Sequence, residues 1–266
     1  MSELGLHPSV DIAAADWLGP RLRRFGSAVA AIVPDGFPAY VRILHPARGT
    51  DDAPVSWAAV AARSGRTMHR RAQFHAISRP LDTAPRAPAL WPVGDANPPA
   101  GNLPPALLRA LCSTLAAHTG TPASCWFCLW DGYDWLHGSP AVTRLTSRDD
   151  GRPVLPPRPV TPTLSPEVLH GLRVHLPHRD YILFEGALDA APELGDTIGD
   201  TIFPQSPNLF WPHDHAWCVA SEVDLLCTLV AGPEPLAAAL LADSRLEVWR
   251  VDPGDPIAFD SDQINT

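Results

Sequence analysis

The amino-acid sequence predicts an α+β fold with a mixed, mainly antiparallel sheet and several packed helices. Segments with helical apolar spacing and segments rich in β-branched and aromatic residues follow one another in an irregular order, without a sustained strand–helix alternation. Apolar residues make up 45% of the 266 residues, which argues against disorder. A chain of this length can bury most of its apolar surface without disulfides or metals, so we expect it to fold with no cofactor.

Helices are expected where apolar residues repeat at helical spacing between start and stop signals. In the strongest example, Pro104 and Pro105 suit the first turn and Gly120 follows the last. In a second, Ser56 is expected to cap the helix and Gly65 to end it. The expected helices are residues 103–118, 56–65, 235–241 and 11–25, the last interrupted at 19–20.

Strands are expected where β-branched and aromatic residues run together. One of these runs contains a Cys-x-x-Cys spacing, which occurs in zinc and redox sites. In a strand, however, Cys125 and Cys128 point to opposite faces, so we interpret the pair as part of a buried strand. The expected strands are residues 28–33, 40–44, 125–130, 181–184, 217–225 and 246–251.

A proline-rich segment, residues 151–166, is the best candidate for a domain boundary. It coincides with a change in charge: residues 1–150 hold 14 Arg against 12 Asp and Glu, whereas residues 151–266 hold 6 Arg against 17. We therefore predict an N-terminal α+β lobe (1–150), a linker or surface crossing (151–166) and an acidic C-terminal α+β lobe (167–266). The two lobes can pack as one compact unit.

The basic residues exclude several chemistries, because all 20 are Arg and the chain contains no lysine. Schiff-base catalysis, pyridoxal phosphate attachment and the lysine-containing phosphate loop are therefore excluded. The acidic C-terminal half would repel a phosphate backbone, so a nucleic-acid partner is not expected.

The sequence also predicts a cytoplasmic protein that does not enter a membrane. No stretch approaches the ~20 uninterrupted apolar residues that cross a bilayer, and the N-terminus lacks the pattern of a secretory signal. The five cysteines, an odd number, suit a reducing compartment. Oligomeric state stays open.

The most distinctive segment, residues 207–224, is rich in aromatic residues and histidine and ends in two carboxylates. Glu222 and Asp224 are expected on one face of a strand, close to tryptophan side chains that make rigid anchors in pockets. We predict a non-catalytic binding protein whose aromatic, partly acidic pocket takes a small polar or cationic ligand, or an Arg-rich protein surface. The expected ligand-binding residues are Trp211, Trp217, Glu222, Asp224, Glu185 and Tyr133.

The same segment supports an alternative, a metal-assisted hydrolase or transferase. His213 and His215 share one face of an extended chain, which allows two imidazoles to hold one ion, with Glu222 as a third ligand. A metal held in this way activates water for attack. The sequence leaves open whether the protein is an enzyme.

Several strings resemble a family of actinobacterial proteins of unknown function. They are VPDGFPAY at 33–40 with LHP at 44–46, CWFCLWDGY at 125–133, SPNLFWP at 206–212 and AWCVASEVD at 216–224. This resemblance implies a cytosolic protein and assigns no activity to any residue. The string PDGFPAY at 34–40 is also similar to the Leu-Pro-x-x-Tyr motif of the SMI1/KNR4-like immunity and scaffold proteins, which implies a binding role.

Overall fold

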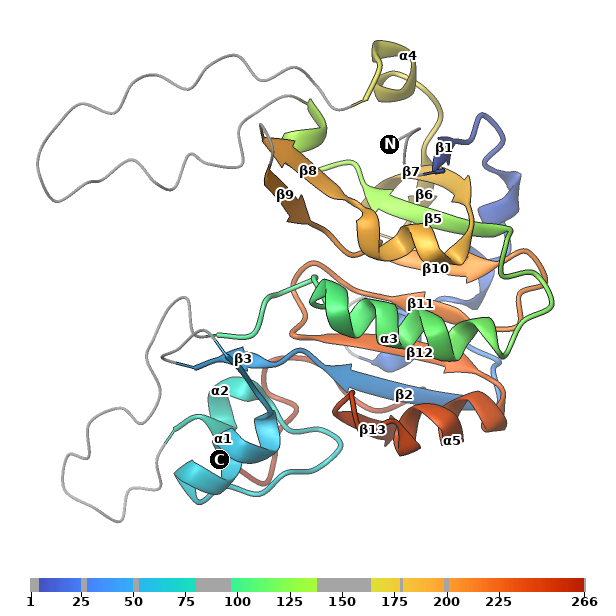
Figure 1. Ribbon diagram of the computed structural model, residues 1–266. Helices are drawn as coiled ribbons and strands as arrows, with labels where there is room; N and C mark the ends of the chain where they lie inside the picture. Colours follow the sequence, from blue (N-terminus) through green and yellow to red (C-terminus); the bar gives the residue numbers. More distant parts are fainter. Residues whose placement is uncertain are drawn as a thin grey trace, which may run out of the picture.

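The computed structural model describes residues 5–24, 28–49, 53–79, 97–137, 164–177, 179–198 and 201–265. In these ranges one antiparallel sheet runs through the molecule and helices pack on it, so the fold is α+β (Figure 1). The strand order is β1-β7-β5-β10-β11-β12-β2-β13, and β6 also pairs with β7. The strands are β1 (His7–Pro8), β2 (Ala39–Leu44), β5 (Cys125–Trp130), β6 (Val174–Leu176), β7 (Arg179–Gly186), β10 (Leu209–Pro212), β11 (Cys218–Ala220), β12 (Cys227–Gly232) and β13 (Val248–Val251).

Two small hairpins, five helices and five 3-10 segments are found outside the main sheet in the described ranges. Two small hairpins stand apart from the main sheet, β3 (Ala47–Arg48) with β4 (Pro54–Val55) and β8 (Gly195–Ile198) with β9 (Thr201–Pro204). The helices are α1 (Trp57–Ser64), α2 (Phe74–Ile77), α3 (Pro105–Ala116), α4 (Pro166–Leu169) and α5 (Glu234–Ala242). The 3-10 segments are η2 (Ala13–Ala15), η3 (Gly19–Arg21), η4 (Val29–Ala31), η5 (Asp134–His137) and η6 (Leu188–Glu193). Among the helices of these ranges, none is long and apolar enough to cross a membrane.

Both faces of the sheet are covered, which buries its central strands completely. Successive side chains of a strand point to opposite faces. Phe127 accordingly packs into the core formed with α3, α5 and η6, whereas Cys128 packs into the core on the opposite face. In Figure 1, α3 lies across the first of these faces, beside α5. Cys125 and Cys128 fall into different cores, which confirms that the two thiols of the Cys-x-x-Cys spacing point apart.

The predicted helices 56–65, 103–118 and 235–241 are confirmed by α1, α3 and α5. At α1 the expected signals are visible: Ser56 Oγ accepts from Ala59 N, and Gly65 follows with a φ of 70°. The carboxylate of Glu247 also accepts from Trp57 N at 2.7 Å and Ala58 N at 2.8 Å, the favourable end of the helix for an anion.

Three of the predicted elements differ from the structure. Within residues 28–33, Val29–Ala31 form the 3-10 segment η4 instead of a strand. The N–H groups of Val29 and Ala30 bond Asp255 O and Pro253 O, and Ala28 makes one isolated bridge to Pro256. A short apolar run alone does not separate the two structures. Of the helix expected at 11–25, the described residues 11–24 form only the short segments η2 and η3. The strand expected at 217–225 ends at Ala220, so Glu222 and Asp224 lie in the turn that leads to β12.

The main sheet takes strands from both sides of the proline-rich segment. β5 lies between β7 and β10, and β2 lies between β12 and β13, so strands of 1–150 are inserted among strands of 167–266. Most of the predicted linker, residues 151–163, lies outside the described residues. The two predicted lobes thus share one sheet and its cores.

Candidate functional site

Two of the predicted ligand-binding residues meet at Arg179, the first residue of β7. Arg179 Nη2 lies 2.5 Å from Glu222 Oε1 and 2.8 Å from Asp224 Oδ2. Glu222 is 9% exposed, Arg179 13% and Asp224 80%, so the buried carboxylate and the guanidinium are held together beneath an exposed one. Burial alone lowers the pKa of Arg179, but the two carboxylates outweigh it and raise that pKa. The guanidinium is therefore charged and bound within the chain.

Aromatic residues complete this cluster. The Arg179 Cζ atom lies 4.9 Å from the ring centroid of Trp130, and Trp130 meets the ring of Tyr133 edge to face at 5.2 Å. Asn208 forms hydrogen bonds with both aromatic residues: its Oδ1 accepts from Trp130 N, and its Nδ2 donates to Tyr133 Oη. Burial raises the pKa of Tyr133 to about 12. The predicted combination of aromatic rings and carboxylates is present here, and a cation of the chain itself, Arg179, occupies it.

A cavity of about 380 Å³ opens on the outer side of this cluster. Its lining consists of Trp130, Asp131, Gly132, Leu176, Arg179 and Asp180, and we name it the charged pocket. Gly132 is required there, because a Cβ atom would lie 2.2 Å from Trp130 Cζ2. Asp131 pairs with Arg173 at 3.1 Å, and Asp180 pairs with His175 at 2.6 Å. Each charged group of this lining thus already has an oppositely charged or ionisable partner.

The other predicted ligand-binding residues lie elsewhere. Trp211 and Trp217 are fully buried and belong to the cores on opposite faces of the sheet. Trp217 Nε1 donates to Leu115 O of α3 at 3.2 Å. Glu185 is exposed near the far end of β7 from Arg179, opposite Trp126 of β5. The structure therefore brings together Tyr133, Glu222 and Asp224, and places the other three outside the cluster.

The residues of the metal-site alternative do not converge. His213 and His215 lie exposed in the turn between β10 and β11, and the length of β11 separates them from Glu222. His215 stacks on Trp17 with ring centroids 4.6 Å apart. Over the described ranges, no group of three or more His, Cys, Asp or Glu side chains is arranged to hold a metal ion.

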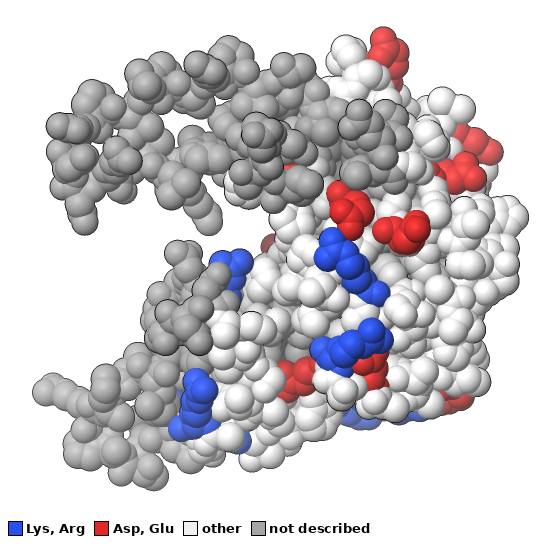
Figure 2. All heavy atoms as spheres, in the orientation of Figure 1, with Lys and Arg blue, Asp and Glu red and all other residues white. Residues whose placement is uncertain are grey.

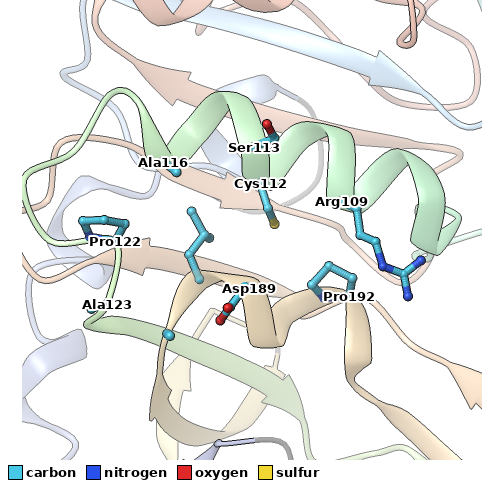
Figure 3. A pocket seen from close by; sticks show the side chains of 10 residues that line it. Arg109, Cys112, Ser113, Ala116, Pro122, Ala123, Asp189 and Pro192 are labelled. Atoms are coloured by element: carbon cyan, nitrogen blue, oxygen red, sulfur yellow. The ribbon is translucent and has the colours of Figure 1, made fainter.

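A second hollow lies at the other end of β5, between α3 and η6, and we name it the α3–η6 groove. Its volume is about 630 Å³. In Figure 3, side chains of α3 form one wall, and the opposite wall comes from the chain before β5 and from η6. The lining residues are Arg109, Cys112, Ser113, Ala116, Pro122, Ala123, Ala187, Leu188, Asp189 and Pro192. Figure 2 shows this side of the molecule as mostly uncharged, with acidic side chains over η6 and basic ones over α3.

Backbone and side-chain hydrogen bonds fix the walls of the groove. Leu188 N donates to Pro122 O at 2.9 Å, which ties η6 to the chain before β5. The loop after α3 is held by Asp214, whose carboxylate accepts from Gly120 N at 2.7 Å and from Thr119 Oγ1 at 2.8 Å. Although burial raises the pKa of Asp214, these hydrogen bonds lower it below its usual value. The groove is thus preformed, and Asp214 serves as an anchor rather than as a ligand residue.

The chemistry of the groove is mainly apolar. Leu188 and Cys112 are buried in it, and burial, with smaller effects of Cys125 and Asp189, raises the pKa of the Cys112 thiol to about 12. Arg109 pairs with Glu193 at 2.8 Å, and both side chains are about half exposed, at 56% and 43%. Asp189 is exposed, and the structure shows no hydrogen bond or ion pair to it from any described residue.

Sequence reasoning did not single out the residues of this groove. One sequence pattern does indicate the α3 wall of the groove: Cys112 and Ala116 are four residues apart and widen the leucine stripe of α3 into a broader apolar face. This face alone does not define a groove, because the second wall comes from residues far along the chain.

Comparison of the chain with models of protein families, with curated proteins and with solved structures found no match.

Proposed function

We propose that this protein is a non-catalytic binding protein that holds a small, mainly apolar molecule in the α3–η6 groove. The observation that carries this proposal is a preformed apolar groove of about 630 Å³. Ligand sites commonly have volumes of ~300–1,000 Å³ and apolar walls with a few polar groups. The charged pocket is the weaker candidate because its charges are already paired within the chain. A ligand there would have to replace existing ion pairs.

The lining of the groove supports binding rather than catalysis. With a pKa of about 12, the Cys112 thiol stays protonated at neutral pH, and a protonated thiol is a poor nucleophile. Within the described lining there is no histidine, and Arg109 and Asp189 are the charged residues. An exposed carboxylate and a permanently charged guanidinium do not form an acid–base pair that works near pH 7.

The proposed setting is the cytosol. All five cysteines are buried and none forms a disulfide, which suits a reducing compartment. The acidic net charge of −9 supports a partner other than nucleic acid. The resemblance to actinobacterial proteins forms part of the same proposal.

Filling the groove tests the function. Ala116 is partly buried in the groove wall, so Ala116→Trp places an indole where the ligand would lie. We expect the wild-type protein to bind the neutral apolar dye Nile red with one site, and the variant to bind it at least tenfold more weakly. Fluorescence titration measures both affinities.

Ala117→Trp is the matched control, because Ala117 is exposed and does not line the groove. This variant should bind the dye as the wild type does. If circular dichroism shows that Ala116→Trp does not fold, Ala123→Trp replaces it as the test, because Ala123 is exposed on the opposite wall of the groove. The proposal is wrong if the wild-type protein does not bind the dye, or if a folded groove-filling variant binds it equally well.

A further inference from the structure

We infer that the ligand of the α3–η6 groove is an apolar amine, a molecule with an apolar body and one ammonium or amidinium group that pairs with Asp189. This inference rests on the proposed function and names the ligand class of the same site. Of the two charged groups in the described lining, Arg109 already has Glu193 as its partner. Asp189 has no partner among the described residues, so the charge left for a ligand to neutralise is negative.

Asp189 lies where a charged group of a bound molecule can reach it. Figure 3 shows Asp189 on the wall opposite α3, between Ala123 and Pro192. Its negative charge acts on the thiol of Cys112, whose pKa it helps to raise, although burial is the larger cause. The carboxylate therefore contributes a negative potential inside the groove as well as at its rim.

The C-terminal end of α3 adds to this potential. Ala116, the last residue of α3, lines the groove. Asp189 lies on the wall that faces α3, next to Leu188, whose N–H donates to Pro122 O on the same wall. A helix C-terminus carries about half a negative charge and favours cations in the last turn. The Arg109–Glu193 pair lies nearer the other end of α3, so the groove has an acidic end and an electrically balanced end. A molecule with one cationic group has one preferred orientation in it.

A series of three ligands with the same apolar body tests the inference. Octylamine, which is protonated at pH 7, 1-octanol and octanoate are compared by their displacement of Nile red from the wild-type protein. We expect octylammonium to bind roughly tenfold more tightly than octanoate, with octanol between them. Because exposed charges are screened, the preference should shrink at 0.5 M salt while the affinity for octanol does not fall.

Asp189→Asn separates this inference from the proposed function. The variant should lose most of the preference for octylammonium and keep the wild-type affinity for octanol. Asp224→Asn is the matched control, because Asp224 is an exposed carboxylate of the Arg179 cluster and not of the groove. It should keep the preference. If octanol and the dye bind but octanoate binds as tightly as octylammonium, or if Asp189→Asn keeps the preference, the ligand class is wrong and the groove stands. If the dye binds but no ligand of the series displaces it, the ligand class is wrong; if the dye does not bind either, the proposed function itself fails.

The absence of lysine allows a direct localisation of the amine. A water-soluble carbodiimide joins a carboxylate to an amine held against it, with loss of water taken up by the carbodiimide as a urea. Since the chain has no lysine side chain to compete, octylamine is the main amine in the reaction. Peptide mass spectrometry should find the adduct mainly on Asp189, and excess octanol should suppress it. Adduct spread evenly over the exposed carboxylates, unaffected by octanol, contradicts the inference.

Discussion

The charged pocket and the α3–η6 groove lie at opposite ends of β5, and they differ in how far the chain itself satisfies their side chains. In the charged pocket, Arg179 pairs with two carboxylates and lies over Trp130, while Asp131 and Asp180 each have a partner. In the groove, the lining is mostly Ala, Pro, Leu and Cys, and Asp189 is left without a partner among the described residues.

This difference shows why conspicuous residues are a poor guide to a binding site in this protein. Buried charges and polar groups are costly unless they are paired, so a stable fold tends to pair them internally. An apolar hollow leaves apolar surface in contact with water, so an apolar ligand that covers this surface is favoured. The charged residues that attract notice in the sequence, Glu222 and Asp224, are thus already paired with Arg179 of the chain itself.

The largest effect is expected where the internal pairing is broken. Arg179→Met removes the partner of Glu222, which is only 9% exposed, and should lower the free energy of unfolding by about 3–5 kcal/mol. Urea denaturation at pH 7 measures the loss. Dye binding in the groove at low urea should be unchanged, because the two regions share no lining residue.

A double variant identifies the cause of that loss. Removing both charges, as in Arg179→Met with Glu222→Leu, should restore most of the stability, since a buried ion pair is replaced by apolar contacts. If Arg179→Met lowers the free energy of unfolding by less than about 1 kcal/mol, Glu222 does not depend on Arg179 for its stabilisation. The charged pocket would then be more open to a ligand than the ion pairs indicate.

An acid-sensitive effect of intermediate size is expected at the buried histidine His45. His45 is fully buried, with Nδ1 2.6 Å from Pro99 O and Nε2 2.9 Å from Thr228 Oγ1. The Thr228 hydroxyl lies 2.7 Å from Ser221 Oγ, in the residue before Glu222. Burial lowers the pKa of His45 to about 4, with the charge of Arg42 acting in the same direction and the hydrogen bond to Pro99 against it.

The sign of this effect follows from the proton balance. Between pH 6.5 and about 4 the unfolded chain protonates this histidine and the folded chain does not. The stabilisation is therefore complete above pH 6.5 and is lost as the pH falls towards 4, by roughly 3 kcal/mol in total. Denaturation curves across this range measure the slope. The variant His45→Gln has no titrating group at this position, so its free energy of unfolding should change less steeply with pH. A slope equal to that of the wild type would show that another group takes up the proton.

The sequence predicted the fold class and the helices with explicit start and stop signals, because capping residues and leucine spacing act locally. It failed at residues 28–33, where distant carbonyls at Pro253 and Asp255 decide the backbone structure. Glu222 and Asp224 were expected side by side on a strand, whereas the structure brings both to Arg179 from a turn, and Arg179 was not recognised as their partner. The groove was missed because it exists only when η6 packs beside α3, and neither wall contains a residue type that signals binding.

The smallest effects are expected from exposed charges of the two regions. Asp224→Asn leaves Arg179 with Glu222, and Arg109→Gln breaks a half-exposed pair with Glu193, so each should change the free energy of unfolding by less than ~1 kcal/mol. Their effects on octanoate should differ, however, since only Arg109→Gln removes a positive charge from the groove. We expect that variant to bind octanoate more weakly and octylammonium no more weakly than the wild type does. Equal ligand affinities for both variants would show that the rim charges do not act on a bound molecule, and the groove would then select its ligand by apolar contact alone.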